Sequence, residues 1–318
     1  MKPTNFNILI TSLSDKVPLI LAVKAASKKL GNEGKIIGAD IDKNCIGSYF
    51  VDHFYEIEKL SDINLNSFLE YCKSNNIKAI IPTRDGELLW FAKNMTFFSK
   101  HGIAIMISEA KAIESCIDKL KFAETLEKKN FPTIKTTNTI DNLDAASFVV
   151  KEQFGAGSRS IGLNLDRSNA LNHSLKLEHP MFQPFIKGEE ISVDIYYDKA
   201  GKAKGGIARK RILVVNGESQ ITTTFNSPEI IELCSKAGEQ LGLYGHAVWQ
   251  VIIDENNKPQ IIECNSRFGG ASTLSVACGL DSFYWFLLES ENSELSKHPF
   301  IPNKTIRTQI RYKTDKLI

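Results

Sequence analysis

The sequence predicts two architectures in series: an α/β domain with a parallel sheet, followed by an α+β region built from antiparallel hairpins. The first third of the 318 residues alternates short β-branched runs with helical patterns, which is typical of strand-helix-strand units. Beyond residue 130, strand-like runs follow one another with turn signals between them. The length is sufficient for two or three domains, each with a core of its own.

Composition and charge argue against several classes of protein. Basic residues number 39 and acidic residues 37, and 42% of the residues are hydrophobic, which is not typical of disordered or low-complexity chains. The net charge of +2 disfavours nucleic acid or an anionic membrane as a partner. The amino terminus has no signal-peptide pattern, no apolar run is long enough to span a bilayer, and the six cysteines form no C-x-x-C pair. We therefore expect a cytoplasmic protein with reduced thiols.

The first domain is predicted to be Rossmann-like. Its first helix should begin near Pro18 and end at Gly31, because proline suits the first turn of a helix and glycine suits its end. The turn at residues 11–16 lacks the G-x-G-x-x-G sequence that lets a backbone approach a pyrophosphate, so dinucleotide binding is not expected. Strands are expected at residues 6–13, 35–41, 77–82 and 102–108, and helices at 17–30 and 62–75.

The second region is predicted to begin with a helix and to continue mostly as strands. The most glycine- and serine-rich stretch of the chain, residues 154–162, follows one of these strands. A Lys-Ala-Gly sequence at residues 199–201 indicates a hairpin turn. Helices are expected at residues 109–130, 228–243 and 281–289, and strands at 147–154, 181–186, 190–197, 247–253, 260–265 and 305–312.

The hairpin near residue 256 is the most informative segment. If its turn is centred on Asn256-Asn257, Gln250 lies opposite Glu263, with their Cβ atoms about 5 Å apart. The period of two along a strand then places Asn265 and Arg267 on the same face. Oxygen ligands of this kind suit Mg²⁺ that shares phosphate oxygens with a substrate. The alternative is the solvated face of an edge hairpin.

A possible phosphate site precedes the glycine-rich stretch. Lys151 lies on the predicted strand just before Gly155, Ala156, Gly157 and Ser158. The backbone N–H groups of such a loop can surround phosphates, and the ammonium adds a point charge. The pattern is not the Walker form, and an ordinary flexible loop is the alternative.

Taken in chain order, several segments resemble the ATP-grasp superfamily over nearly the whole length, most closely the carboxylate–amine ligases related to carbamoyl phosphate synthase. The resemblance implies a Rossmann-like preceding domain followed by a two-lobed ATP-grasp fold. The expected domains are residues 1–110, a small lobe at 111–186 that carries a glycine-rich lid, and a large lobe at 187–318 that carries the metal and acceptor sites. The segments are residues 81–87 (IPTRDGE), 116–122 (CIDKLKF), 150–158 (VKEQFGAGS), 183–194 (QPFIKGEEISVD) and 263–270 (ECNSRFGG).

The same resemblance implies a role for each matching residue. Lysines would contact the nucleotide phosphates, hinge backbone would bind the adenine edge, an acid would hold the ribose, and the hairpin face would hold the metal. Arg267 and Lys151 would be catalytic, near the transferred phosphoryl group. The implied ATP site comprises Lys119, Lys151, Gly155, Ala156, Gly157, Ser158, Gln183, Phe185, Ile186 and Glu190, and the implied metal ligands are Gln250, Glu263 and Asn265.

Three positions depart from the pattern common in that family. Glu152 stands where proline often follows the second lysine, Ser266 stands where proline often follows the metal-site asparagine, and Pro184 replaces a common hinge glutamate. None of the three removes a charge that the chemistry needs. The departures bear on nucleotide geometry more than on the reaction class.

The acceptor side is less well defined. Strand alternation sends Arg209 and Arg211 to one face, where they and Arg267 are candidates for a substrate carboxylate, and a solvated face is the alternative. Arg307 and Arg311 are further candidates. Arg84, Asp85 and Glu87 have two interpretations: they either contribute to the acceptor site or cap the next helix. His246 and Trp249 are expected to be packing residues rather than catalysts.

The expected function is an ATP-dependent ligase that joins a carboxylate to an amine through an acylphosphate and releases ADP and phosphate. Its cofactors would be ATP and Mg²⁺, with Mn²⁺ as a substitute, and its substrates small molecules resembling amino acids. The first domain offers a face for a homodimer. The alternatives are phosphorylation of bicarbonate or another small acid, as in carbamoyl phosphate chemistry, and an inactive ATP-binding module.

Overall fold

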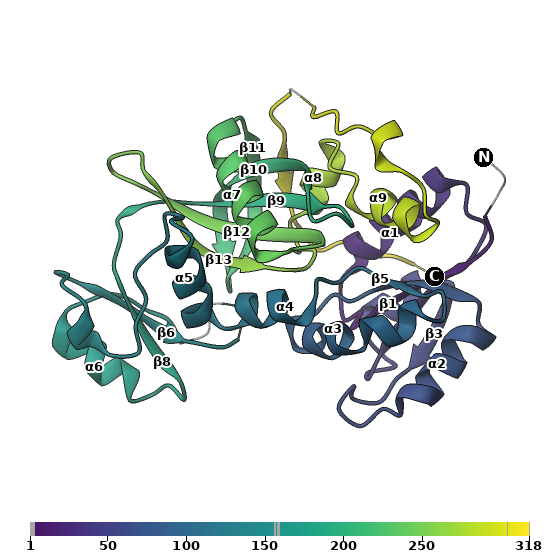
Figure 1. The fold of residues 1–318 in the computed structure, drawn as a ribbon, viewed down its shortest axis with the longest axis horizontal. Helices are drawn as coiled ribbons and strands as arrows, with labels where there is room; N and C mark the ends of the chain where they lie inside the picture. Colours follow the sequence, from purple (N-terminus) through teal and green to yellow (C-terminus); the bar gives the residue numbers. More distant parts are fainter. Residues whose placement is uncertain (1–3, 156, 158–159, 304, 318) are drawn as a thin grey trace.

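The computed structural model describes residues 4–155, 157, 160–303 and 305–317. Figure 1 shows three parts: a first domain in purple and blue, a small teal lobe, and a large lobe in green and yellow. Each part is built on its own sheet, of five, three and six strands. These sheets fall within the predicted segments 1–110, 111–186 and 187–318.

The first sheet is parallel, with the strand order β3-β2-β1-β4-β5. The strand predicted at residues 102–108 is only two residues long, and β3 was not predicted because it is short and half exposed. The other strands lie within their expected ranges. The five strands are β1 (Asn7–Thr11), β2 (Ile36–Asp40), β3 (His53–Glu56), β4 (Ile77–Ile81) and β5 (Ala104–Ile105).

Helices cover both faces of this sheet. Ile8 and Ile10 of β1 point toward α1 and α9, whereas Leu9 points toward α2 and α3, as the period of two requires. The first helix has its predicted bounds, with Pro18 in its first turn and Gly31 at φ 76° after its last residue. The elements are α1 (Val17–Leu30), α2 (Leu65–Ser74), α3 (Asp85–Ser99), α9 (Ser282–Ser290) and the 3-10 turn η1 (Ile46–Phe50).

The helix predicted at residues 109–130 is two helices, α4 (Ala110–Ile117) and α5 (Lys119–Lys128). Asp118 separates them in an extended conformation, and its carboxylate accepts the N–H groups of Leu120 and Lys121, both at 3.0 Å. The prediction of one continuous helix was therefore wrong. The apolar pattern continues across Asp118, so it gave no sign of the break that this N-cap residue makes.

The small lobe is an antiparallel sheet with the order β7-β6-β8. Helix α6 (Arg167–Ser174) packs on it and was not predicted, because its residues form no clear apolar face. Asp166 caps this helix through the Asn169 N–H. The other elements are β6 (Phe148–Glu152), β7 (Gly162–Leu165), β8 (Pro180–Pro184) and the 3-10 turn η2 (Ile140–Asn142).

The large lobe contains an antiparallel sheet with the order β13-β12-β9-β10-β11-β14. Its core face contacts α5 and α7, and the aromatic helix α9 packs against α1 of the first domain. The elements are β9 (Gly188–Tyr197), β10 (Ala203–Val215), β11 (Glu218–Phe225), α7 (Pro228–Leu241), β12 (Gly245–Asp254), β13 (Pro259–Asn265), α8 (Thr273–Ala277), the 3-10 turn η3 (Leu295–Lys297) and β14 (Thr308–Ile310).

The hairpin of β12 and β13 confirms the register that matters and corrects the turn. Gln250 lies opposite Glu263, as predicted, and Val248 lies opposite Asn265. The register then shifts between Gln250 and Val251, so the outer half of the hairpin closes around a single residue, Asn256, instead of an Asn256-Asn257 pair. The β-bulge at this shift therefore allows Gln250 to pair with Glu263 although the turn is centred on a different position from the predicted one.

Strand β9 shows how the sheet divides core from cavity. Ile191, Val193 and Ile195 are buried on the core face, and by alternation Ser192 and Asp194 belong to the opposite, polar face. One face of the sheet therefore packs in the core, and the opposite face contributes to the site. In the part of the chain that the structure describes, no helix is both long and apolar enough to cross a membrane.

Candidate active site

A cavity of about 750 Å³ lies between the small and large lobes. Fourteen of the residues proposed from the sequence line it. Ala156 and Ser158 of the predicted lid lie outside the described residues. The predicted residues that line the cavity are Lys119, Lys151, Gly155, Gly157, Gln183, Phe185, Ile186, Glu190, Arg209, Arg211, Gln250, Glu263, Asn265 and Arg267.

Lys151 reaches the cavity from β6 and is only 7% exposed. Burial lowers the pKa of its ammonium group, and the carboxylates of Glu263 and Glu190 oppose that shift. An ammonium that has lost much of its water gains more from a polyphosphate than an exposed one does. Its position therefore suits contact with the phosphates of a nucleotide.

Lys119, the first residue of α5, reaches the lid loop. Its Nζ donates to the carbonyl oxygen of Gly155 at 2.7 Å and to that of Gln153 at 3.5 Å. Gly155 and Gly157 have φ values of 100° and 82°, a region that favours glycine. A phosphate at Lys119 would replace these carbonyl oxygens, so nucleotide binding and the position of the lid are coupled.

The hinge between β8 and β9 lines one end of the cavity. The side chain of Gln183 is buried and donates to Oγ1 of Thr136 at 2.8 Å. The N–H of Phe185 donates to the carbonyl oxygen of Ser147 at 2.9 Å. The Phe185 N–H is therefore used in a hydrogen bond within the small lobe. Of the two predicted hinge residues, Ile186 is the one whose backbone could contact an adenine edge.

Glu190 and Arg211, which both line the cavity, form an ion pair. Burial raises the pKa of the Glu190 carboxyl, and the Arg211 guanidinium opposes this rise. With the amide of Gln250 oriented to satisfy its neighbours, its nitrogen lies 3.3 Å from Glu190 and 3.2 Å from Glu263, and its oxygen lies 3.0 Å from Arg211. One network thus joins the predicted ribose acid to the predicted metal face.

Gln250, Glu263 and Asn265 share the cavity face of β12 and β13. The Nδ2 of Asn265 donates to Oε1 of Glu263 at 3.4 Å, and no other described residue donates to Oδ1 of Asn265 or to the second carboxylate oxygen. Among the described residues no group of three or more His, Cys, Asp and Glu could hold a metal. One carboxylate with two amides instead fits a hard cation that takes its remaining ligands from water and phosphate.

Arg267 connects the large lobe to the first domain. Its Nε and Nη2 donate to the two carboxylate oxygens of Asp85 at 2.8 and 2.7 Å, a bidentate pair. Asp85 is the first residue of α3. The arginine expected near the transferred phosphoryl group is therefore oriented by the first domain.

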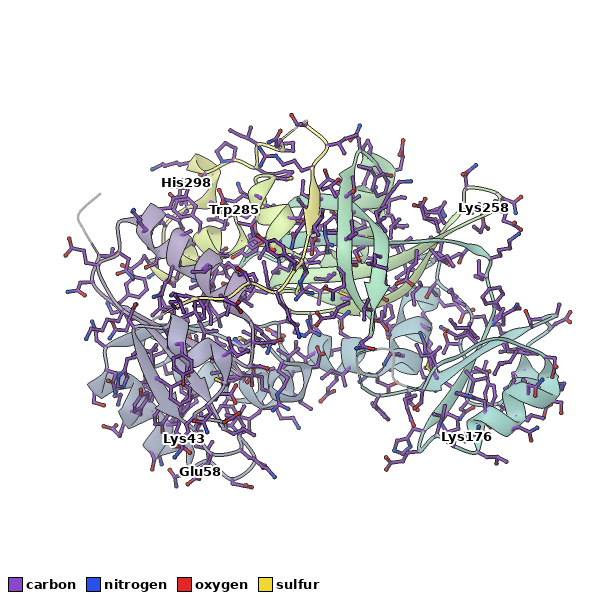
Figure 2. The ribbon with its side chains drawn as sticks, turned by 180° about the vertical axis from the view of Figure 1, so that it is seen from behind. Lys43, Glu58, Lys176, Lys258, Trp285 and His298 are labelled. Atoms are coloured by element: carbon purple, nitrogen blue, oxygen red, sulfur yellow. The ribbon has the colours of Figure 1, made fainter. Side chains whose placement is uncertain are left out.

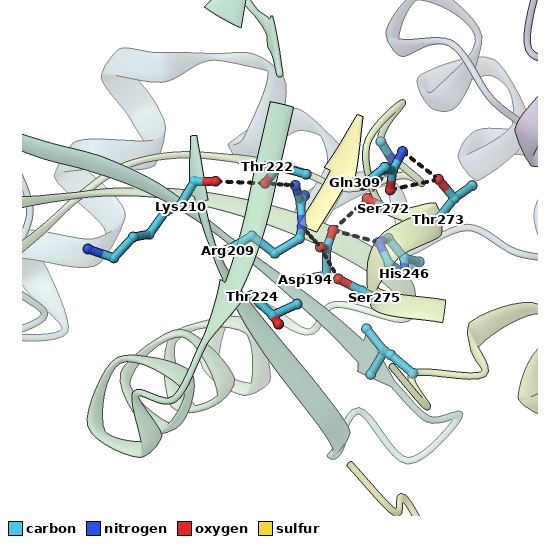
Figure 3. Close-up of polar contacts among 12 residues, drawn as sticks. Asp194, Arg209, Lys210, Thr222, Thr224, His246, Ser272, Thr273, Ser275 and Gln309 are labelled. Atoms are coloured by element: carbon cyan, nitrogen blue, oxygen red, sulfur yellow. Dashed lines mark hydrogen bonds and ion pairs between the residues drawn. The ribbon is translucent and has the colours of Figure 1, made fainter. Parts of the chain in front are cut away.

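Arg209 lines the cavity, yet its side chain is only 2% exposed. Figure 3 shows its guanidinium against Asp194, a completely buried carboxylate. The two interact at 2.5 Å, and the Arg209 guanidinium helps to hold the pKa of Asp194 well below its usual range against the effect of burial. Arg209 is neutralised within the protein, and Arg211 and Arg267 are likewise paired, with Glu190 and Asp85.

Asp194 is the centre of a buried polar cluster, defined here as Asp194, Arg209, His246, Ser272 and Ser275. Both serine hydroxyls donate to Asp194 at 2.5 Å, and His246 Nε2 lies 3.2 Å away. Ser272 in turn accepts the N–H of Gly269 at 3.2 Å. The cluster therefore fixes the loop after Arg267, and His246 is buried within it.

Asp194 was not predicted as a site residue, although it is the last residue of the family motif at residues 183–194. Alternation from Glu190 places Asp194 on the cavity face of β9, which was the available signal. The pairing of Asp85 with Arg267 had no local signal, because it joins residues 182 positions apart. Trp249, expected to pack, is buried and donates to the Tyr197 hydroxyl at 3.1 Å.

Two family models match the chain. One, for the ATP-grasp domain, covers residues 116–271, and the other, for a PylC-like N-terminal domain, covers residues 8–106. Residues 116–271 therefore form an ATP-grasp domain, and the predicted fold is confirmed. No curated protein matches the chain significantly.

Solved structures share this architecture at low sequence identity. The biotin carboxylase domain dimer of 2-oxoglutarate carboxylase from Hydrogenobacter thermophilus, with MgADP, ADP and bicarbonate, has a TM-score of 0.75 and 18% identity over 95% of this chain and 74% of that one. N5-carboxyaminoimidazole synthetase from Staphylococcus aureus, with ADP, has a TM-score of 0.73 and 15% identity over 93% of this chain and 80% of that one. The L-amino acid ligase from Bacillus licheniformis has a TM-score of 0.71 and 16% identity over 94% of this chain and 78% of that one. These likenesses establish the common fold.

Proposed function

We propose that this ATP-grasp enzyme joins a small-molecule carboxylate to an amine, with ATP and Mg²⁺. One observation carries the proposal: Lys119 and Lys151 of the small lobe, the Glu263 face and Arg267 line a single cavity. The shared fold of structures solved with ADP and MgADP, and of an L-amino acid ligase, supports it.

The protein positions the nucleotide from several elements. The backbone at Ile186 would meet the adenine edge and Glu190 the ribose, while Lys119 and Lys151 would contact the phosphates. Gly155 and Gly157 add backbone N–H groups from the lid. Phosphoryl transfer needs little covalent work from a protein, so this placement of charge is the main catalytic contribution.

Glu263 and Asn265 would hold Mg²⁺ or Mn²⁺, because carboxylate and amide oxygens are of the type that such a cation accepts beside phosphates. Gln250 would join them only if its amide turned, since its oxygen faces Arg211. When bound, the cation neutralises developing charge on the phosphate oxygens. The open oxygens of Glu263 and Asn265 support this assignment.

The reaction would proceed in two steps. A substrate carboxylate oxygen attacks the γ-phosphorus of ATP, and the bond to the β-phosphate oxygen breaks, which gives an acylphosphate and ADP. A neutral amine then attacks the acyl carbon, phosphate leaves with the electrons of its C–O bond, and the amine nitrogen loses a proton. Arg267 and Lys151 would stabilise charge on the phosphoryl oxygens in the first step.

An acylphosphate hydrolyses readily, so water must be kept from it. The loop from Gly155 to Gly162 is the candidate lid, and its carbonyl contact with Lys119 offers a means to couple closure to nucleotide binding.

The test is amine-dependent ADP release with a panel of amino acids. Lys151→Ala and Glu263→Ala should each lower kcat/KM at least 100-fold, because each removes charge stabilisation that is present in the transition state. Lys176→Ala is the matched control, since Lys176 is exposed and lies at the outer end of the small lobe (Figure 2). Turnover that survives both site substitutions would refute the proposal.

Bicarbonate is the second candidate for the carboxylate, because the fold is shared with a biotin carboxylase domain solved with that anion. ADP release that depends on bicarbonate and not on an organic acid would favour it. MgATP binding without turnover on the whole panel would identify an inactive binding module.

We also propose a cytoplasmic location, because all six cysteines are buried free thiols. A homodimer through the first domain is a further proposal, supported by the dimer of a structural relative. Light scattering would give the mass in solution, and a monomeric mass at micromolar concentration would exclude it.

A further inference from the structure

The first sheet has a topological switch point between β1 and β4. From β1 the chain continues to β2 and β3 on one side, whereas β4 and β5 lie on the other side. Ligands of open parallel sheets bind in the crevice that such a reversal leaves at the carboxyl ends of the strands. The loops at this crevice carry Ser12 and Lys16 after β1 and Arg84 after β4.

Two cationic side chains converge on Ser12. Nζ of Lys16 donates to the Ser12 carbonyl oxygen at 2.6 Å, and Nε of Arg84 lies 3.4 Å from its hydroxyl. Among the described residues, neither cation has a carboxylate within ion-pair distance. By contrast, the cavity residues Arg209, Arg211 and Arg267 are each paired with a carboxylate.

The acids of the crevice are already engaged. Glu87 is buried and accepts the N–H groups of Thr83 and Arg84 and the Ser12 hydroxyl. Asp40 accepts the N–H of Ser14, and Asp85 holds Arg267. Glu87, Asp40 and Asp15 all lie close enough to Lys16 to raise the pKa of its ammonium group, so the crevice holds acids as well as bases. Among the described residues, Lys16 and Arg84 are its cations without an ion-pair partner.

Lys16 is incompletely solvated as well as unpaired. Burial lowers the pKa of its ammonium group; the nearby Glu87 carboxylate raises it and Arg267 lowers it further. Ser12 and Ser14 have φ values of 51° and 48°, a conformation that costs free energy for these residues. Among the described residues, this strained loop thus holds an ammonium with no carboxylate at ion-pair distance, which leaves the ammonium available to the carboxylate of a ligand.

The crevice adjoins the reaction cavity. Arg267, which lines that cavity, is bound by Asp85, the residue next to Arg84. Helices α1 and α3 also begin here, directly after Lys16 and Arg84, so the positive ends of both dipoles add to the field.

We propose that Lys16 and Arg84 bind a spectator carboxylate of the amine substrate, which is therefore an amino acid. This inference rests on the proposed ligase function. The carboxylate that is phosphorylated must lie with the γ-phosphate at the Glu263 face, so one bound in the first domain belongs to the other substrate. Anchored at the crevice, that substrate directs its amine past Arg267 toward the acylphosphate.

The experiment compares each amino acid that supports ADP release with the amine that lacks its carboxylate, for example L-alanine with ethylamine. Wild-type protein should prefer the amino acid by about 100-fold in kcat/KM, since charge-assisted bonds to a carboxylate are lost with the amine. Lys16→Met and Arg84→Gln should each reduce that preference about tenfold through KM for the amino acid, and Arg84→Lys should restore part of it. The affinity for MgATP, measured by calorimetry, should not change.

Matched controls are Lys100→Met, an exposed lysine at the opposite end of α3, and Arg167→Gln, an exposed arginine of the small lobe. A preference that is equal in wild type, Lys16→Met and Arg84→Gln would overturn the site while amine-dependent ADP release upheld the ligase. If wild type released no ADP, titration of the same amino acids into the MgADP-loaded protein would decide. Binding weakened by both substitutions would support the site, and unchanged or absent binding would overturn it.

Discussion

At the scale of single residues, the chain neutralises its arginines with acids drawn from distant parts of the sequence. Arg211 is paired with Glu190, Arg267 with Asp85 and Arg209 with Asp194. The whole-chain balance of 39 basic and 37 acidic residues gave no sign of this arrangement. Near-neutrality therefore reflects, in part, a site whose charges are paired locally.

The buried cluster around Asp194 yields a prediction about stability. Asp194→Asn keeps the shape but leaves Arg209 as an uncompensated buried charge, so the free energy of unfolding at pH 7 should fall by roughly 3–5 kcal/mol. Because the folded-state pKa of Asp194 is depressed, its stabilising contribution is fully present above about pH 4, the ordinary pKa of aspartate, and is lost only as the pH falls further.

Urea denaturation as a function of pH measures this difference. The control is Asp141→Asn, since Asp141 is exposed and pairs with Arg167 on the surface, and its effect should be below about 0.5 kcal/mol. Equal losses in the two variants would contradict the assignment of Asp194 as a buried electrostatic centre.

At the scale of elements, patterns with a clear period gave good predictions, whereas elements without one were missed. The alternation of β12 and β13 was enough to pair Gln250 with Glu263. Helix α6 has no marked apolar face, and the break at Asp118 depends on a single cap. Period-based reasoning therefore paired Gln250 with Glu263 but missed α6 and the break at Asp118.

The lid gives a prediction at this scale. Gly155 and Gly102 both have positive φ, 100° and 74°, and a Cβ added at either would meet no atom within 4 Å. Replacement by alanine should therefore cost about 1 kcal/mol of backbone strain in both cases. Only Gly155→Ala should lower kcat, by about tenfold, because Gly155 belongs to the loop that contacts Lys119.

Steady-state ADP release and thermal unfolding of both variants test the lid. Gly102→Ala serves as the control for strain alone, since Gly102 lies at the end of α3 away from the cavity. If Gly102→Ala slowed turnover as much as Gly155→Ala, the effect would be one of general destabilisation.

At the scale of the whole molecule, the first domain is joined to the ligase lobes by packing and by charge. Helices α1 and α9 lie side by side (Figure 1), and their buried residues belong to one core. Asp85 of the first domain also binds Arg267 of the large lobe. The sequence predicted the order of the three parts and the family motifs. It could not predict this junction, because contacts between residues so distant in sequence have no period.

The junction yields a prediction about catalysis. Asp85→Ala should release Arg267 from its bidentate contact and lower kcat by about 10- to 100-fold, because a catalytic group that loses its orientation loses transition-state contact. The dissociation constant of MgATP should stay within twofold, since Asp85 does not line the nucleotide cavity.

Single-turnover kinetics and calorimetry separate these two effects. Asp62→Ala is a control on the surface of the same domain. A double variant with Arg267→Ala should be no slower than Arg267→Ala alone. Additive losses would mean that Asp85 acts on turnover by another route.

The bulge between Gln250 and Val251 has a practical consequence for engineering. It absorbs a change in register between the ligand pair and the hairpin tip, and Figure 2 shows Lys258 at that tip, at the outer edge of the molecule. Insertions at residues 255–257 should therefore leave the Gln250–Glu263 pairing intact. The tip is the natural position for a fluorescent label or an affinity tag in a catalytically competent protein.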